Sequence, residues 1–291
     1  METTLNEAKL EKKTLVFYHG GCSDGFSAAW IAHKKFGDNA EYIAFGFHET
    51  LNVKGKEIYM LDISVSDKEE DIKKLVENNH VVFIDHHVTR QNLVPLIPES
   101  YFATDRCGSM LAWEYFNPGK KVPALITYVQ DQDLYVWKLP FAREIMVSVN
   151  LSERSFDAWD KMVADLENEK EKSKYVEKGK IIQDYYDKIC KIMMEEGSVF
   201  VNFKGHKVYA INVPHMFGSD IGNELALRTN SFGIVWCENN ESIDISLRSV
   251  RDFDVSDIAK KYGGGGHKNA AGFKLPLGTE KPWKIIKNDK K

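Results

Sequence analysis

Residues 81–87 read Val81-Val82-Phe83-Ile84-Asp85-His86-His87, an apolar run that ends in three polar side chains. Four β-branched or aromatic residues in a row are typical of a fully buried strand. Two similar runs precede it: residues 15–18 stop at His19, and residues 58–61 stop at Asp62. Residues that carry chemistry therefore follow three separate apolar strands.

Helical patterns separate these runs. Residues 26–36 predict one helix, and Ser66-Asp67-Lys68-Glu69 matches a capping box that predicts another helix to about Asn78. A further strand is expected at residues 42–45. Alternation of strands and helices predicts a parallel sheet with helices on both faces. Because ligands bind at the carboxyl ends of such strands, the polar residues that end them should meet at one edge.

The second half of the chain has a different pattern. Residues 157–196 are highly charged and helical, with one apolar residue at every fourth position: Ile181, Tyr185, Ile189 and Met193. This pattern predicts a long connecting helix between two domains; the alternative is a surface helix of the first domain. Strands are then expected at residues 199–201, 208–211, 233–236 and 243–247, and helices at 220–228 and 255–261. We therefore expect a catalytic domain at 1–150, a helical connector at 151–197 and a smaller α/β domain at 198–291.

Charge balance, cysteine spacing and the lack of long apolar runs disfavour several classes of protein. The 39 Lys and Arg residues stand against 43 Asp and Glu residues, a net charge of −4, which disfavours a broad basic face for long duplex DNA. The cysteines are widely spaced without a Cys-x-x-Cys pair, so neither a disulfide framework nor a structural zinc site is indicated. Residues 1–13 are charged, and no run of about 18 apolar residues occurs, so we expect no secretory signal, no membrane partner and a cytoplasmic location.

Further polar residues complete the pattern. His19-Gly20-Gly21-Cys22-Ser23-Asp24-Gly25 lies between a strand and a helix, and Asp131 and Asp133 end a helical segment at residues 124–130. Carboxylates and imidazoles are the usual ligands of Mn²⁺, Mg²⁺ or Fe²⁺. Without a cation, clustered carboxylates repel one another. Each element alone is compatible with an ordinary structural role, as a helix cap, a tight turn or a surface histidine, but together they favour a metal site.

In these motifs the sequence resembles the DHH phosphoesterases, which are named for Asp-His-His, over about residues 14–273. This superfamily includes nano-RNases, phosphoadenosine-phosphate phosphatases and RecJ-like exonucleases. Residues 246–249 (Ser-Leu-Arg-Ser) and 262–273 (Tyr-Gly-Gly-Gly-Gly-His-Lys-Asn-Ala-Ala-Gly-Phe) resemble the DHH-associated C-terminal domain. The resemblance implies an N-terminal parallel-sheet α/β domain, a long connecting helix and a smaller C-terminal α/β domain, with the active site in the cleft between the domains.

The resemblance also implies two divalent metal ions, usually Mn²⁺, with Mg²⁺, Fe²⁺ or Zn²⁺ as alternatives. His19 and Asp62 would hold the first ion, and Asp62 would bridge to the second. The expected ligands of the second ion are Asp24, Asp62, His86 and Asp131, with Asp133 as the reserve for Asp131. His87 would face the scissile phosphate, and Asp85 would orient the two histidines.

One position departs from the family pattern. The first motif usually has two aspartates spaced Asp-x-Asp, and here the first of them is Cys22. A thiolate can bind a metal but prefers softer ions than Mn²⁺. The alternatives are a weakened first site or a first site that holds iron or zinc.

Substrate binding is expected in the second domain. The backbone N–H groups of residues 263–266 can approach a phosphate because glycine has no Cβ, and Arg248 offers a fork for phosphate or a plane for a base. The expected contacts are Arg248, Gly264, Gly265, Gly266 and His267. Trp113, Tyr135 and Trp137 are candidates for base stacking, with core packing favoured for each.

The expected substrate is a short single-stranded nucleic acid or a small nucleotide. An acidic chain of this length disfavours a processive exonuclease, which needs a long basic channel. Di- to penta-nucleotides or phosphoadenosine phosphate fit better. The alternatives are a single-strand-specific exonuclease, a cyclic dinucleotide phosphodiesterase, and a nucleotide-binding regulator without catalysis. A homodimer is compatible with the sequence.

Overall fold

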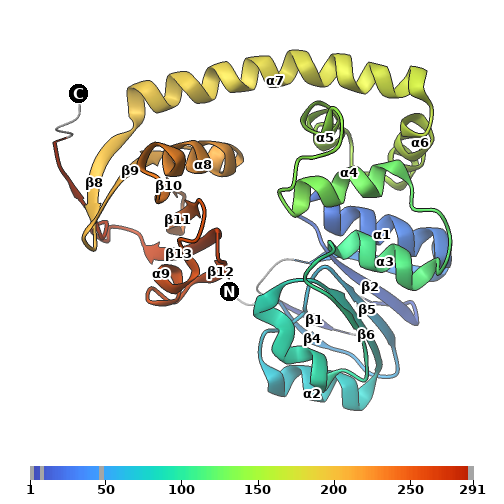
Figure 1. The fold of residues 1–291 in the computed structure, drawn as a ribbon. Helices are drawn as coiled ribbons and strands as arrows, with labels where there is room; N and C mark the ends of the chain where they lie inside the picture. Colours follow the sequence, from blue (N-terminus) through green and yellow to red (C-terminus); the bar gives the residue numbers. More distant parts are fainter. Residues whose placement is uncertain (1–2, 7–9, 46–48, 288–291) are drawn as a thin grey trace. The chain divides into compact units, whose positions relative to one another are not determined.

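The computed structural model describes residues 3–6, 10–45 and 49–287, and the chain divides into two compact units, residues 1–183 and 184–291 (Figure 1). The boundary falls inside helix α7 (Glu169–Gly197). The finer division into domains at 1–150, 151–197 and 198–291 stays a prediction.

The first unit is built on a parallel sheet of five strands. Their spatial order is β3 (Ala40–Phe45), β2 (Thr14–His19), β5 (Glu57–Leu61), β6 (His80–Asp85) and β7 (Glu99–Phe102). Tyr18 pairs with Leu61, and Leu61 pairs with Ile84. The next residues along these three strands, His19, Asp62 and Asp85, therefore follow one rung of the sheet. The predicted parallel sheet is confirmed.

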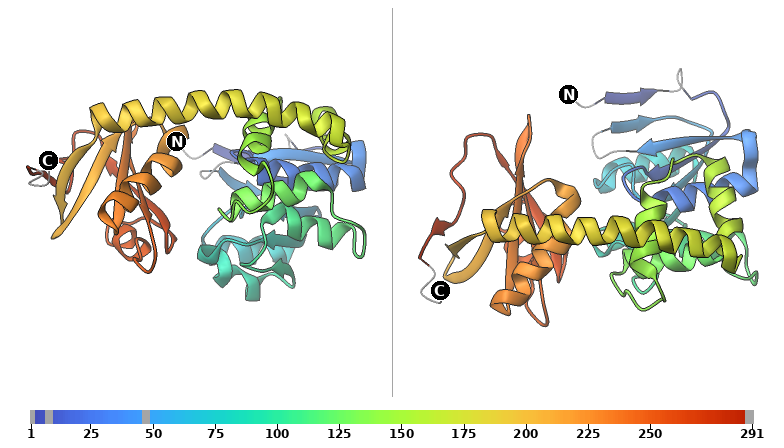
Figure 2. Two further views of the ribbon diagram at one scale, coloured as in Figure 1. Left: turned by 45° about the horizontal axis from the view of Figure 1, so that its top comes forward. Right: turned by 90° about the horizontal axis from the view of Figure 1, so that it is seen from above.

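Helices cover both faces of this sheet (Figures 1 and 2). Alternate residues of β6 enter opposite cores, Val82 and Ile84 on one face and Val81 and Phe83 on the other. The first core is covered by α1 (Ser23–Phe36), α3 (Gly108–Phe116), α4 (Ala124–Asp133), α5 (Ala142–Asn150) and α6 (Phe156–Leu166). The second is covered by α2 (Glu69–Asn78) and the 3-10 helix η3 (Val88–Leu96). Burial on both faces explains the continuous apolar runs in the sequence.

Two short elements add to this unit. β1 (Thr3–Asn6) pairs in parallel with β4 (Glu49–Asn52), and the 3-10 helix η2 (Gly37–Asn39) follows α1. The predicted capping box is wrong in its detail. Ser66 Oγ accepts from the Lys68 N–H at 3.1 Å and donates to Asp71 at 2.9 Å, so it forms a turn before α2 instead of capping it. The predicted end of the helix at Asn78 is confirmed.

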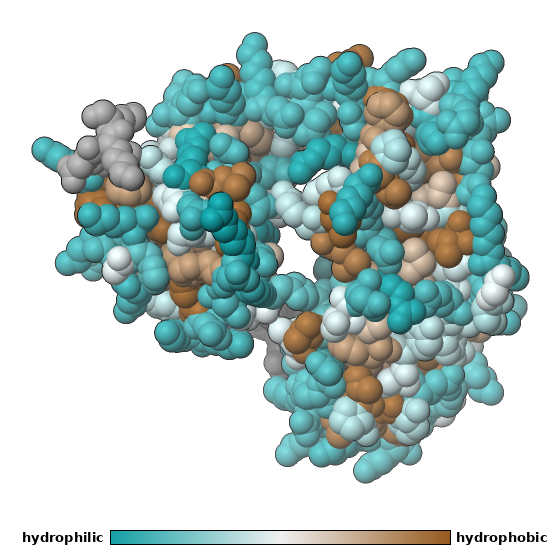
Figure 3. Space-filling view, in the orientation of Figure 1, coloured by the Kyte–Doolittle hydropathy of each residue, from teal (hydrophilic) through white to brown (hydrophobic). Residues whose placement is uncertain are grey.

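The expected long connecting helix is present as α7, which contains the boundary between the two units, but it begins at Glu169 because the chain breaks between α6 and α7. Asn168 causes the restart: its Oδ1 accepts from the backbone N–H groups of Lys170 and Glu171. The predicted apolar stripe is covered only toward its C-terminal end, where Met193 packs against a hydrophobic cluster. Ile181 and Tyr185 are 73% and 67% exposed. The surface along α7, at the top of Figure 3, is mainly hydrophilic. The buried side chains of this helix include Cys190 and Met194 instead.

The second unit contains a mixed sheet of seven strands. Their order is β12 (Gly265–His267), β13 (Ala270–Pro276), β11 (Ser242–Ser249), β10 (Phe232–Glu238), β9 (His206–Asn212), β8 (Val199–Phe203) and β14 (Lys284–Ile285). The pair of β9 and β10 is parallel, and the other pairings of this sheet are antiparallel. The helical elements are η4 (His215–Phe217), α8 (Gly218–Thr229) and α9 (Ser256–Lys260). The expected α/β class is confirmed. Among the described residues, no helix combines the length and the apolar character needed to cross a membrane.

Candidate metal centre

Polar side chains converge where β2, β5 and β6 end. Asp62 and Asp85 are buried, with 1% and 0% of their surface exposed. Three overlapping groups of side chains each bring their donor atoms within 4.8 Å of one another. The groups are His19, Cys22 and Asp62; Asp24, His86 and Asp133; and Asp62, Asp85, His86 and His87. The predicted meeting of strand-end residues is therefore present in the structure.

Asp62 lies at the centre of these groups. Its backbone has φ +58°, in the left-handed region that aspartate tolerates better than most residues, and its N–H donates to the Ile84 carbonyl at 2.8 Å. Its two carboxylate oxygens face different partners. Oδ2 lies 3.5 Å from His19 Nδ1, whereas Oδ1 lies 3.3 Å from His86 Nε2. One carboxylate is thus shared between two sets of donors.

The first set consists of His19, Cys22 and Asp62. Cys22 Sγ lies 3.2 Å from His19 Nδ1 and 3.6 Å from Asp62 Oδ2. Cys22 is also the N-cap of α1, where its sulfur accepts from the Gly25 N–H at 3.3 Å. Burial, together with the carboxylates of Asp62 and Asp24, raises the pKa of the Cys22 thiol. This environment favours a thiolate only when a cation is bound.

The second set consists of Asp24, His86 and Asp133, together with Oδ1 of Asp62. His86 Nε2 lies 3.5 Å from Asp133 Oδ2 and 3.9 Å from Asp24 Oδ2. Burial and the carboxylate of Asp62 raise the pKa of Asp24, and burial and Asp24 raise the pKa of Asp133 to about 8. Burial lowers the pKa of His86, but the carboxylates around it outweigh that effect and raise it to about 9. The metal-free cluster therefore retains protons that a divalent cation would replace.

Asp24 is fixed by the start of α3. Its two oxygens accept from the backbone N–H groups of Gly108 and Ser109 at 2.7 and 2.8 Å. A Cβ on Gly108 would lie 2.6 Å from the Asp62 Cβ and 3.0 Å from Asp24 Oδ2. The absence of a side chain at residue 108 therefore allows both carboxylates to approach this helix end.

Asp85 contacts both histidines of the motif and orients them. Its Oδ1 accepts from the backbone N–H groups of His86 and His87 and lies 2.6 Å from His87 Nδ1. Its Oδ2 accepts from Arg90 at 3.1 Å, and Arg90 is only 5% exposed. Burial would raise the pKa of Asp85, but His87 and Arg90 outweigh it and hold this pKa below its ordinary value. Asp85 is thus an anion that orients His87.

The structure places Asp133 in a group of potential donors with Asp24 and His86 and does not place Asp131 there, so the placement favours the reserve candidate over Asp131, and the choice of ligand stays a prediction. The Asp131 carboxylate forms other hydrogen bonds: it accepts from the backbone N–H groups of Lys138 and Leu139 at 3.0 and 3.1 Å. It thereby fixes the loop that follows α4. Asp133 joins Asp24 and His86 in a group of donors.

The donor atoms fit divalent cations. Oδ1 of Asp62 is buried and accepts no well-formed hydrogen bond among the described residues; the imidazole of His86 lies 3.3 Å away, and a cation between the two would satisfy both donors. The donors around it are carboxylate oxygens and imidazole nitrogens, which suit Mn²⁺ and Mg²⁺, whereas the first set adds a thiol. Clustered acids with raised pKa values are the expected signature of such a site without its ions.

Sequence reasoning missed three supporting residues. Gly108 gives a weak signal, a glycine at the start of an apolar helix. Arg90 follows the Asp-His-His motif by three residues, but nothing in the sequence shows that it is buried against Asp85. Arg154 donates from Nη1 and Nη2 to the carbonyls of Gly20 and Gly21, and this long-range contact leaves no local pattern.

The predicted substrate-binding residues lie in the second unit. Arg248 in β11 pairs with Ala270 in β13, and Ala270 pairs with His267 in β12. Paired residues point to the same face, so Arg248 and His267 share one face about 10 Å apart, at two strand spacings. Ser246 lies on the same face of β11, opposite Gly272. Arg248 also donates to Ser219 Oγ at 3.2 Å. The residues beside Arg248, Ser246 and His267 on this face are small, namely Ala270 and Gly272.

Part of the glycine run is β-strand. Gly265 and Gly266 belong to β12 and pair with Gly272 and Ala271. A Cβ on Gly264 would lie 2.1 Å from the Gly272 carbonyl oxygen, and one on Gly266 would lie 2.5 Å from that of Ala270. Close packing against β13 is therefore one reason for these glycines. Phosphate binding by them stays a prediction.

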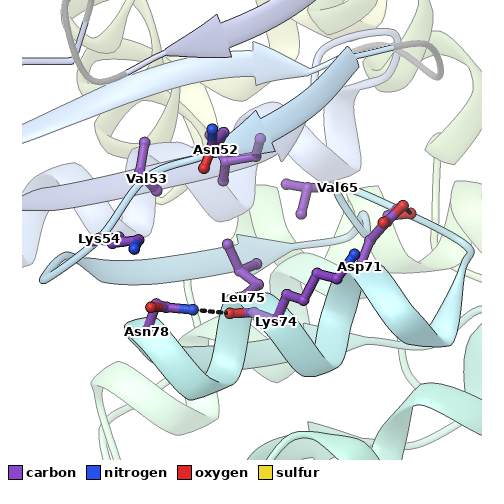
Figure 4. A pocket seen from close by; sticks show the side chains of 10 residues that line it. Asn52, Val53, Lys54, Val65, Asp71, Lys74, Leu75 and Asn78 are labelled. Carbon is purple, nitrogen blue, oxygen red and sulfur yellow. Dashed lines mark hydrogen bonds between the residues drawn. The ribbon is translucent and has the colours of Figure 1, made fainter.

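A cavity of about 260 Å³ lies away from the cluster, between β4, the loop after it and α2 (Figure 4). Lys54 and Lys74 lie at this cavity with Asn52, Asp71 and Asn78, and Val53, Val65 and Leu75 form apolar parts of its lining. None of the grouped donor residues lines it. The candidate site is therefore the strand-end cluster and not this cavity.

Comparison with known proteins relates the chain to one family. The model of the DHHA1 domain matches residues 224–286, which lie in the second unit. An uncharacterized protein of Acanthamoeba polyphaga mimivirus is 31% identical over 288 residues. That match covers 89% of this chain and 66% of the viral protein, so the chain spans just under two thirds of the length of this relative.

Solved structures share the fold. The DHH domain of a protein assigned to a family of ribosomal proteins matches with a TM-score of 0.56 at 14% identity, over 90% of this chain and 82% of that chain. An exopolyphosphatase-related protein from Bacteroides fragilis matches with a TM-score of 0.51 at 14% identity, over 94% and 89% of the two chains. At this level of identity, the likeness concerns the fold alone.

Proposed function

Because the chain belongs to the DHH phosphoesterases and carries a DHHA1 domain, we propose that it hydrolyses phosphoester bonds of short oligonucleotides or small nucleotides with two divalent metal ions. The observation that carries the proposal is the division of the Asp62 carboxylate between two donor sets. A shared carboxylate can bridge two metal ions, and two-metal sites catalyse in-line displacement at phosphorus.

In this proposal the first set is His19, Cys22 and Asp62, and the second is Asp24, Asp62, His86 and Asp133. Bound divalent ions would supply Lewis acidity and a nucleophilic water at neutral pH. The chain fixes the donors in advance. The α3 N-terminus holds Asp24, and the Ile84 carbonyl holds the backbone of Asp62. Mn²⁺ or Mg²⁺ suits the second set, which has only oxygen and imidazole donors.

His87 is the proposed contact to the scissile phosphate. Asp85 lies 2.6 Å from its Nδ1, which fixes the ring and favours a proton at that atom. Nε2 then becomes the atom that contacts a phosphate oxygen, as a donor when the ring is an imidazolium. Arg90 donates to the other oxygen of Asp85 at 3.1 Å and so fixes the carboxylate that orients this ring.

Substrate recognition is proposed for the second unit and for the loop after α4. Arg248, Ser246 and His267 lie on one sheet face with small residues between them, and this arrangement suits a phosphate group. Tyr135 follows Asp133 by two residues and is 43% exposed, so its ring is a candidate for stacking on a base. Trp113 and Trp137 pack against the first core, as the core-packing alternative predicted.

A substrate panel tests the proposal. The full chain is incubated with Mn²⁺ and labelled RNA and DNA oligomers of graded length, phosphoadenosine phosphate and cyclic dinucleotides. We expect turnover to be fastest for dimers to pentamers or for the small nucleotide. A preference for long single strands would favour the exonuclease alternative. Tight binding without turnover of any member would favour the nucleotide-binding regulator.

Asp133 and Asp131 form a matched pair for mutation. Asp133→Asn should weaken binding of the second ion by at least about 100-fold, since even partners of metal ligands contribute 10- to 100-fold. Asp131→Asn should keep the metal but destabilise the protein by about 1–3 kcal/mol, because it weakens two part-buried hydrogen bonds to a carboxylate. Metal content after dialysis and thermal unfolding separate the two effects. Loss of metal only in the Asp131 variant would make Asp131 the ligand after all.

Arg248→Ala should raise KM by about 10- to 100-fold with little change in kcat, because hydrogen bonds to a charged group contribute about 1.5–3 kcal/mol. Steady-state kinetics on the best substrate of the panel measures the effect. Lys207→Ala is the control, since it removes an exposed positive charge from β9 of the same unit. An unchanged KM, or a fall in kcat alone, would remove Arg248 from substrate recognition.

A further inference from the structure

The two donor sets at the strand edge differ in chemistry. Oδ1 of Asp62 lies near the imidazole of His86, which in turn lies near the carboxylates of Asp24 and Asp133. Around Oδ2 the donors are one imidazole and the sulfur of Cys22. Thiolates select borderline and soft ions such as Zn²⁺ and Fe²⁺, whereas carboxylates suit Mg²⁺ and Mn²⁺. The first set should therefore prefer Zn²⁺ or Fe²⁺, and the second set should prefer Mg²⁺ or Mn²⁺.

The three donors of the first set have the spacing of a tetrahedral site. Bonds of about 2.3 Å to sulfur, 2.0–2.1 Å to nitrogen and 2.0–2.2 Å to oxygen place tetrahedral donors about 3.3–3.6 Å apart. The structure has 3.2 Å between Cys22 Sγ and His19 Nδ1, 3.6 Å between Cys22 Sγ and Asp62 Oδ2, and 3.5 Å between His19 Nδ1 and Asp62 Oδ2. Three protein donors leave a fourth position for water or substrate, as in catalytic zinc sites.

We propose that His19, Cys22 and Asp62 form a site for a zinc-type ion, Zn²⁺ or Fe²⁺, so that the centre holds two chemically different metals. The inference rests on the proposed two-metal function and specifies its first site. On binding, the Cys22 S–H proton passes to solvent and the sulfur donates its electron pair to the ion; no oxidant or reductant is needed.

A simpler role for Cys22 is to cap α1 through the Gly25 N–H. This role predicts no metal–sulfur bond, and it makes Cys22→Ser a useful variant, because serine is an effective N-cap and should preserve the fold. Cys22→Asp supplies a hard carboxylate at the same position. Cys237→Ser is the matched control, since it removes a partly exposed cysteine from β10 in the other unit.

The decisive experiment adds Co²⁺ as a spectroscopic probe to the full-length protein after its metals are stripped. We expect a near-ultraviolet thiolate-to-cobalt charge-transfer band that Zn²⁺ abolishes by competition. The band should be lost in Cys22→Ser and unchanged in Cys237→Ser. A wild-type protein that binds Co²⁺ without this band would overturn the proposal, as would a band that survives in Cys22→Ser.

Metal competition gives a second readout. With Zn²⁺ and Mn²⁺ offered together, the wild-type chain should retain one zinc-type ion, and Cys22→Asp should shift the Zn²⁺-over-Mn²⁺ preference of that site at least about 100-fold toward Mn²⁺. An unchanged preference would overturn the proposal. The outcome is independent of the proposed activity: a sulfur–metal band without hydrolysis would contradict only the enzyme, and hydrolysis with Mn²⁺ alone and no band would contradict only the zinc-type site.

Discussion

Replacing Asp62 by asparagine should abolish phosphoester hydrolysis and metal binding together. Both of its oxygens face metal donors, so one substitution removes a negative charge from both sets. We expect kcat to fall by at least about 10³-fold, beyond the loss of a single charge-stabilising donor. The metal-free variant should be less stable than the parent, because burial would raise the pKa of Asp62 but its contacts with His19 and His86 outweigh it and hold this pKa below its ordinary value, so asparagine removes a favourable charge interaction.

The matched control for this variant is Asp38→Asn. Asp38 is exposed in η2, at the beginning of β3 and thus at the opposite edge of the sheet. Activity, metal content and thermal unfolding are measured for both variants. If the Asp62 variant kept two ions per chain, the bridging role would be wrong even if activity were lost.

His87→Ala should retain both metal ions and lower kcat by at least about 10²-fold. The ring is fixed by Asp85 at 2.6 Å and lies 3.7 Å from Asp62, beside the metal donors, so we assign it to the reacting phosphate. Loss of one such charge-stabilising contact has an effect of this size. KM should change little, because the contact strengthens only in the transition state.

His80→Ala is the control for this substitution, since His80 begins the same strand that His87 follows and is exposed with Glu99 as its partner. Single-turnover kinetics separates the chemical step from product release. A normal chemical rate in His87→Ala would remove His87 from the mechanism. Loss of metal in that variant would show that it is a ligand.

The catalytic half of the fold was predictable because its strands are buried on both faces. A continuous apolar run as short as residues 81–84, in a chain whose helical segments lie between such runs, is typical of a parallel strand with no solvent-facing side. The break between α6 and α7 leaves no signal in the apolar periodicity, because it coincides with a helix cap, in which Asn168 Oδ1 accepts from the backbone N–H groups of Lys170 and Glu171. The short strand β12 was not predicted, because glycine is rare inside strands. Its glycines pack closely against β13, where a Cβ on Gly266 would clash.

The choice between Asp131 and Asp133 shows the limit of the sequence for the site. Residues two apart on a helix point in directions about 200° apart, so only one of them can face the cluster. The sequence places both at the end of α4, but the orientation depends on how α4 packs on α1 and α3. Gly108 and Arg90 were missed for a related reason: their roles are defined by distant residues, Asp24 and Asp85.

The central claim is that the strand-end cluster is a two-metal phosphoesterase site. The most direct test titrates stripped protein with divalent ions while bound metal and hydrolysis of a short oligonucleotide are measured in the same samples. We predict no turnover in chelator and full activity only when two ions are bound per chain. Undiminished hydrolysis in chelator, or full activity with a single bound ion, would contradict the two-metal site.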